Sequence, residues 1–176
     1  PAGVQPGPPA TSGSKPNDIL PFPKPDPKIW KKNPKPTDDE IDLELLPSKG
    51  GHKFYAKIDN NGIVTISIET RVNKQHSEHL GTGRQNFDRM FHHFESNGHE
   101  IKGWTGLIVD ANYAPIPKAR KANPKLTDEE LLFYSVTGKE FWKPWIEKNR
   151  RVLVDSEAKE YATFLSFDAK FAKMHK

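Results

Sequence analysis

The 176-residue sequence contains no cysteine. Disulfide frameworks, thiolate metal sites and a cysteine nucleophile are therefore excluded. Apolar residues never form a run long enough to span a membrane. We expect no signal peptide at the start of this sequence. Methionine is also scarce, since Met90 and Met174 are the only two and the first residue is Pro1. We expect this chain to be a piece of a longer polypeptide.

Proline is abundant but unevenly distributed. Twelve of the sixteen prolines lie in the first fifty residues, and every second residue of 21–27 is proline. Because proline fixes φ and lacks an N–H, this stretch cannot enter a helix interior or a central strand. We therefore expect a proline-rich leader over residues 1–47. It is either a semi-rigid spacer or a strap in which Phe22, Ile29 and Trp30 dock onto the following domain.

Charge also differs between the two parts of the chain. The first fifty residues carry seven basic and seven acidic side chains, so the excess of +4 lies on the remainder. We expect that remainder, residues 48–176, to form one domain. Its modest positive charge is compatible with RNA, DNA or an acidic protein as a partner.

Two segments have strong secondary-structure patterns. Asn61-Gly62 lies between alternating runs over 54–58 and 63–68, which predicts a β-hairpin. Four apolar residues at helical spacing predict a helix over 84–96, ended by Asn97-Gly98. These four residues are Phe87, Met90, Phe91 and Phe94.

Weaker signals complete the expected fold. Capping boxes at 37–40 and 127–130 predict a short helix or turn after each. Pro115 and Pro117 predict a loop. The expected strands are 101–109, 151–155 and 161–171. The order β-β-α-β-α-β-β predicts an α+β fold, with a mixed or antiparallel sheet and helices on one face, behind the proline-rich leader.

Several short motifs follow one another at a characteristic spacing: Gly81–Phe87, His93-Phe94, Ile101–Trp104, Asn112-Tyr113, Asn123–Glu130 and Val136–Lys139. Together, over residues 52–171, they resemble C-terminal domains of bacterial polymorphic toxins, the variable tips of Rhs, YD-repeat and related interbacterial or insecticidal toxins. The resemblance implies a secreted or delivered effector that acts in the target-cell cytoplasm and is neutralised by a cognate immunity protein. The leader would connect it to a parent toxin shell or delivery protein.

Histidine is the natural acid–base side chain at neutral pH, and five of the seven histidines lie within 76–99. On the expected helix, His93 flanks the apolar stripe and can line a pocket, although a structural histidine is the alternative. His76, Glu78 and His79 share a loop, which lacks the fixed spacing of helical metal ligands. We therefore predict no metal site.

Phosphate binding is indicated just before the expected helix. Gly81 and Gly83 place backbone N–H groups at a helix N-terminus, and Arg84 adds a cation. Thr137-Gly138-Lys139 can bring a hydroxyl and a second cation to the same place. The alternative for Gly138 is a simple helix C-cap.

These residues favour a metal-independent ribonuclease that needs no cofactor. The predicted catalytic residues are His79, His93, Arg84, Lys139 and Arg71, and the predicted substrate-binding residues are Gly81, Gly83, Trp104 and Thr137. One alternative is a toxin that consumes NAD, with Arg71 and either Glu157 or Glu160 as its active groups. Another is a binding or adaptor module without chemistry.

Overall fold

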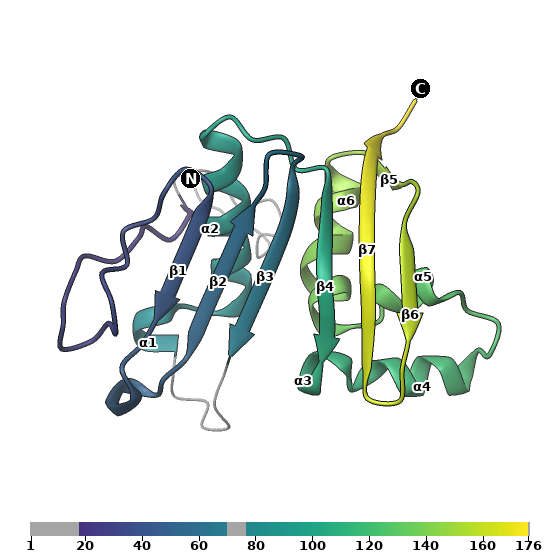
Figure 1. Cartoon of the computed structure of the whole chain (residues 1–176), viewed down its shortest axis with the longest axis horizontal. Coiled ribbons are helices and arrows are strands. Elements are labelled where there is room, and N and C mark those ends of the chain that lie inside the picture. The colour runs from purple at the N-terminus through teal and green to yellow at the C-terminus, as the bar shows by residue number, and fades with distance from the viewer. Residues whose placement is uncertain (1–17, 70–76, 176) are drawn as a thin grey trace, which may run out of the picture.

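The computed structural model describes residues 18–69 and 77–175. It has an α+β fold, as the sequence predicted, and its mixed sheet contains seven strands (Figure 1). Along the sheet the order is β1-β2-β3-β4-β7-β5, and β6 lies beside β7; every pair is antiparallel except β3–β4. The strands are β1 Glu40–Glu44, β2 Lys53–Ile58, β3 Ile63–Glu69, β4 Gly103–Val109, β5 Arg151–Leu153, β6 Glu157–Glu160 and β7 Phe164–Lys173.

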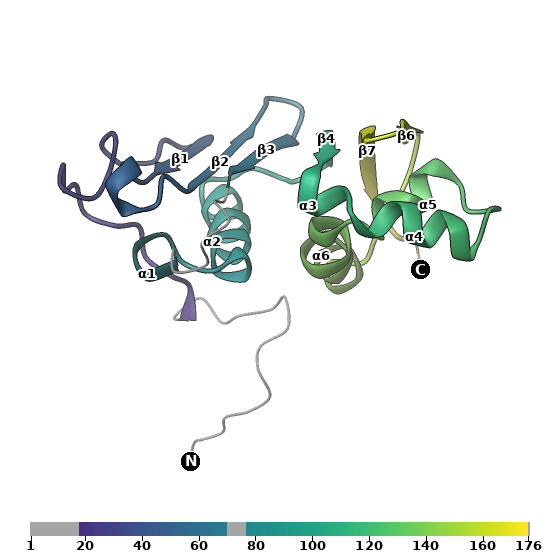
Figure 2. The ribbon, with the colours of Figure 1, turned by 90° about the horizontal axis from the view of Figure 1, so that it is seen from below.

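The helices of the described chain lie on one face of this sheet (Figure 2). They are α1 Ser77–Leu80, α2 Gly83–Ser96, α3 Asp110–Tyr113, α4 Pro115–Ala122, α5 Asp128–Leu132 and α6 Lys143–Lys148, with a 3-10 turn, η2, at Pro47–Lys49 and a π-helical turn, η3, at Gly138–Trp142. Helices α1 and α2 lie beneath the β1–β3 half, and the later helices lie beneath the β4–β7 half.

The two strongest sequence patterns are confirmed. Strands β2 and β3 form the hairpin, and the Asp59 carboxylate accepts hydrogen bonds from the N–H groups of Asn61 and Ile63 in the turn. Gly62 has φ +79°, a conformation that L side chains rarely adopt. In α2, the N-cap Thr82 completes a capping box with Gln85.

Residues 41–46 were predicted as a short helix or turn, and this prediction is wrong. They contain most of strand β1, which forms an edge of the sheet. Every second residue, Ile41, Leu43 and Leu45, is fully buried. This alternation is the repeat of a β-strand, and it outweighs the helix-capping motif. The Thr37 hydroxyl does not cap a helix here; it donates to the Asp39 carboxylate.

The loop predicted around Pro115 and Pro117 is helix α4. Pro115 occupies the first turn, where a missing N–H breaks no intrahelical bond. Ile116 and Ala119 then bury one face.

Strand β6 was not predicted either. Its four residues, Glu-Ala-Lys-Glu, have no strand pattern of their own, and they form a strand because they pair with β7.

The leader packs against the domain as a strap. Trp30 is only 4% exposed and forms a β-bridge with Leu45, while Phe22 and Ile29 pack against the core. The structure therefore favours the strap over the passive spacer. Both Trp30 and β1 precede residue 48, so the packed unit includes part of the segment assigned to the leader.

Tyr55 is expected to titrate unusually late. Its hydroxyl donates to the Glu40 carboxylate at 2.7 Å on the open face of the sheet. Burial, and then the neighbouring Glu40, raises the pKa of Tyr55 from 10.0 to about 12. A raised folded pKa means that this contact stabilises the fold below pH 10 and ceases to do so as pH rises through about 12.

An alkaline titration followed by phenolate absorbance tests this expectation. Tyr55→Phe should remove the latest-ionising component, and Glu40→Gln should move it to lower pH. If the phenolate absorbance of the wild type and of Tyr55→Phe rose identically at the highest pH values, the prediction would be contradicted.

Candidate functional site

The parallel pair β3–β4 separates along its length. Its ladder joins only Ile63–Thr65 to Gly103–Thr105, and the two strands then diverge (Figure 1). The next residue of β4, Gly106, has φ +147°, a backbone conformation that favours glycine. The carboxyl ends of β3 and β4 therefore lie apart at one end of the sheet. In α/β proteins this is the end at which ligands commonly bind.

Helix α2 and turn η3 contact each other at this end. The Arg84 guanidinium donates to the Glu140 carbonyl oxygen at 3.0 Å and lies over the Phe141 ring. The Phe141 ring also packs against Gly83, where a Cβ would lie 3.1 Å from its Cζ. The N-terminal turn of α2 is thereby fixed beside the turn that bears Lys139.

Asn112 joins η3 to the end of β4. Its Oδ1 accepts from the Thr137 N–H at 2.8 Å and from the Thr137 hydroxyl at 3.2 Å, and its Nδ2 donates to the same hydroxyl at 2.9 Å. Thr137 is 8% exposed, so its hydroxyl has a structural partner. Asn112 belongs to the motifs that carry the resemblance, but no sequence signal indicates that it pairs with Thr137.

Gly138 opens the π-helical turn and is not a helix C-cap, because α5 already ends at Leu132. Its N–H donates to the Ser135 hydroxyl, which in turn donates to the Leu132 carbonyl. A Cβ at position 138 would collide with that carbonyl oxygen, so only glycine fits. The turn leaves Lys139 exposed and directs Trp142 into the core.

Five of the predicted residues therefore lie on two segments that contact each other. These are Gly81, Gly83 and Arg84 at the start of α2, and Thr137 and Lys139 at the start of η3. His79 is half-buried on α1, two residues before Gly81. Arg71 lies outside the described residues.

Two predicted residues lie elsewhere. Trp104 is 3% exposed and stacks on Trp142 at 5.0 Å, so it belongs to the core. His93 follows Gly83 by ten residues, about 15 Å along the helix. Its Nε2–H donates to the Thr37 carbonyl at 2.6 Å, and its ring meets Phe22 edge-on.

The site at the ends of β3 and β4 is suited to an anion. Arg84 and Lys139 are basic side chains, and the first turn of α2 carries the positive end of the helix dipole. Asp110 and Glu140 are the acidic residues of the adjoining turns, and both are exposed. This arrangement can bind and stabilise a phosphoryl group.

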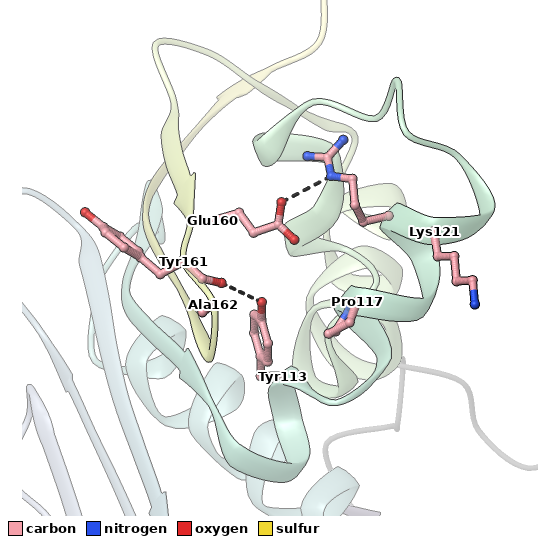
Figure 3. Close-up of a pocket in the computed structure, with 7 residues that line it drawn as sticks. Tyr113, Pro117, Lys121, Glu160, Tyr161 and Ala162 are labelled. Carbon is pink, nitrogen blue, oxygen red and sulfur yellow. Dashed lines mark hydrogen bonds and ion pairs between the residues drawn. The ribbon is translucent and has the colours of Figure 1, made fainter.

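A separate pocket of about 450 Å³ lies between α4 and β6, lined by Tyr113, Pro117, Arg120, Lys121, Glu160, Tyr161 and Ala162 (Figure 3). Its arginine is fully engaged within the protein. Arg120 donates to the carboxylates of Glu160 and Asp128 and to two backbone carbonyls. It therefore ties α4, α5 and β6 together and has little capacity left for a ligand.

The glutamates of the NAD alternative do not face one another. Glu157 pairs with Asp168 of β7, and Glu160 pairs with Leu165. Because Glu157 and Glu160 are an odd number of residues apart on one strand, their side chains lie on opposite faces of the sheet. Glu160 is occupied by Arg120.

Within residues 18–69 and 77–175, no group of three or more His, Asp and Glu side chains could hold a metal ion. The loop residues His76, Glu78 and His79, for which the sequence predicted no metal site, are not covered as a set, because His76 lies outside these residues. No helix in the same part of the chain is long and apolar enough to cross a membrane. Comparison of the chain with protein-family models, with curated proteins and with solved structures found no match.

Proposed function

We propose that this chain is the effector domain of a delivered bacterial toxin and that it cleaves RNA without a metal ion. The observation that carries the proposal is the contact between the start of α2, with Arg84, and η3, with Lys139, at the carboxyl ends of β3 and β4. The positive charge of the chain and the resemblance of its motifs to polymorphic-toxin tips support it further.

In the proposed reaction, Arg84 and Lys139 bind the scissile phosphate and stabilise the charge that develops on its oxygens. His79 removes the proton from the ribose 2′-hydroxyl, and that oxygen forms a new bond to phosphorus. The bond from phosphorus to the 5′ oxygen breaks, and the imidazolium returns its proton to this leaving oxygen. The products are a 2′,3′-cyclic phosphate and a free 5′-hydroxyl. The proposed reaction requires neither a cofactor nor a metal.

The partners follow from the same proposal. An effector of this kind acts in the cytoplasm of the target cell and needs a cognate immunity protein in the cell that makes it. The leader, through residues upstream of the strap, would connect the domain to its parent shell or delivery protein.

Expression of the whole chain in bacteria tests the reaction. The whole chain is required because β1 and Trp30 precede residue 48. Total RNA and the NAD pool are measured from the same cells before growth stops. We expect fragmented RNA with intact NAD for the wild type and for the control His175→Gln, and intact RNA for His79→Gln.

Other results would redirect the assignment. Depleted NAD with intact RNA would contradict the ribonuclease and favour an NAD-consuming toxin with Arg71 and either Glu157 or Glu160 as its active groups. No change in either pool, in cells that continue to grow, would favour a binding or adaptor module.

A further inference from the structure

The leader covers a row of polar side chains on α2. Asn86, Arg89 and His93 follow one another at helical spacing and share one side of the helix. Leu20 and Pro21 contact Arg89 through their carbonyl oxygens, and the Leu20 side chain reaches Gly81 at the N-terminal end of the helix.

Arg89 is the centre of this row. It is 2% exposed and donates from Nε to the Leu20 carbonyl at 3.2 Å and from Nη2 to the Pro21 carbonyl at 3.0 Å. Its Nη1 donates to Asn86 Oδ1 at 2.8 Å. Thus all three of these acceptors are neutral oxygens, two of them supplied by the leader.

Phe22 closes the cover over the row. The Arg89 guanidinium lies 5.2 Å from the centre of the Phe22 ring, and the His93 ring meets the same ring edge-on at 5.1 Å. One aromatic side chain of the leader therefore contacts both Arg89 and His93, and water has little access to Arg89.

The contact leaves a buried positive charge without an anion among these acceptors. Burial lowers the pKa of Arg89 to about 10, which reflects the cost of removing a guanidinium from water. Neutral carbonyls offset that cost less than a carboxylate or phosphate would, because an anion adds a direct attraction between opposite charges to the hydrogen bonds. Arg89 is therefore better matched to an oxyanion than to the leader.

The covering segment differs from the strap that follows it in its backbone hydrogen bonds. From Asp26 onwards, backbone hydrogen bonds fix the leader, including those between Lys31 and Glu44 and between Leu46 and Ile29. In the described chain, no such backbone–backbone bond involves residues 20–25. Residues 20–22 are thus held by the Arg89 hydrogen bonds and by side-chain contacts, whereas Trp30 also has backbone bonds.

We propose that Arg89, held by the Asn86 amide oxygen, forms an oxyanion-binding site and that Leu20–Phe22 covers this site as a removable intramolecular lid. The Asn86 amide nitrogen already donates to the Gly81 and Thr82 carbonyls, and His93 donates to the Thr37 carbonyl, so Arg89 supplies the donors. Detachment of the lid frees two guanidinium donors, and a phosphate group takes the place of the two carbonyls. The site itself is independent of the reaction proposed above; only the assignment of the oxyanion as an RNA phosphate rests on that proposed function.

Binding of inorganic phosphate to the whole chain tests this proposal by calorimetry. Phe22→Ala weakens the lid, and Lys24→Ala is a matched control in the same leader, because Lys24 is exposed. We expect Phe22→Ala to bind phosphate about tenfold or more tightly than the wild type, since less free energy is needed to open the site. Lys24→Ala should match the wild type, and adding Arg89→Gln to Phe22→Ala should abolish the gain.

Circular dichroism shows whether each variant is folded. A folded Phe22→Ala protein that binds phosphate no more tightly than the wild type would overturn the proposal. So would a gain that persists in the double variant with Arg89→Gln, because the phosphate would then bind elsewhere.

A short single-stranded RNA separates the site from the reaction. Displacement of phosphate by this RNA supports nucleic acid as the source of the oxyanion, and failure to displace it supports a small free oxyanion in the same site. A phosphate gain without RNA cleavage would count against the ribonuclease alone. RNA cleavage with equal phosphate affinity in all variants would count against the covered site alone.

Discussion

Trp142→Ala is expected to destabilise the domain by about 3–5 kcal/mol, the usual cost of removing a large buried aromatic side chain. Trp142 is fully buried. It stacks on Trp104, meets Phe91 and Trp145 edge-on and contacts Phe171. Its loss would leave a cavity where helix α2, turn η3 and the sheet meet. Small domains have a free energy of unfolding of only about 5–15 kcal/mol. The substitution would therefore remove a large part of the stability of this domain.

Urea unfolding followed by circular dichroism measures this change. Trp142→Phe should cost much less, because it keeps an aromatic ring and removes an indole N–H that has no hydrogen-bond partner in the described structure. The control is Val152→Ala on the exposed side of β5, where 43% of the valine is exposed. Equal unfolding midpoints for Trp142→Ala and Val152→Ala would show that the aromatic cluster is not the main source of stability.

The largest expected effect on activity is at Lys139 and Arg84. Each single alanine variant is expected to lower kcat for RNA cleavage about 10²–10³-fold, the range found when one group that stabilises transition-state charge is removed. Arg84→Lys should recover only part of the loss. Lysine keeps the charge, but it cannot reproduce the planar contact with Phe141 and the bond to the Glu140 carbonyl together.

Purified protein and a short single-stranded RNA serve for this measurement. Lys118→Ala is the matched control, because Lys118 is exposed on α4, away from η3. Tryptophan fluorescence reports whether the cluster beside η3 is intact in each variant. If Lys139→Ala and Lys118→Ala cleave RNA equally fast, Lys139 has no part in the reaction.

Local signals predicted several elements of this fold correctly. The Asn61-Gly62 turn, the apolar stripe of α2 and the capping box at Thr127 each depend on neighbouring residues only. The correct α+β class followed from these elements and their order. Where two local signals competed, as in residues 37–46, the prediction favoured the capping motif. In the structure these residues form a strand, because alternating side chains are buried when the segment pairs with β2.

The candidate site was predictable as a set of residues but not as an arrangement. The sequence indicated glycines and an arginine before α2, and a Thr-Gly-Lys motif far along the chain. Nothing in either segment indicated that Arg84 would contact the backbone at Glu140. The same limit explains why Trp104 was expected to bind substrate, although it lies in the core.

The sequence alone determined those properties that arise within a few residues: the absence of thiol chemistry, the uneven charge and proline content, the hairpin, and the capped helices. Only the tertiary structure decided the strand character of Glu40–Glu44 and Glu157–Glu160, the contact of α2 with η3, and the position of the leader over Arg89. The reason is that burial and hydrogen bonding are satisfied by partners distant in the sequence. A local pattern shows which residues need such a partner, but the folded chain determines which partner they receive.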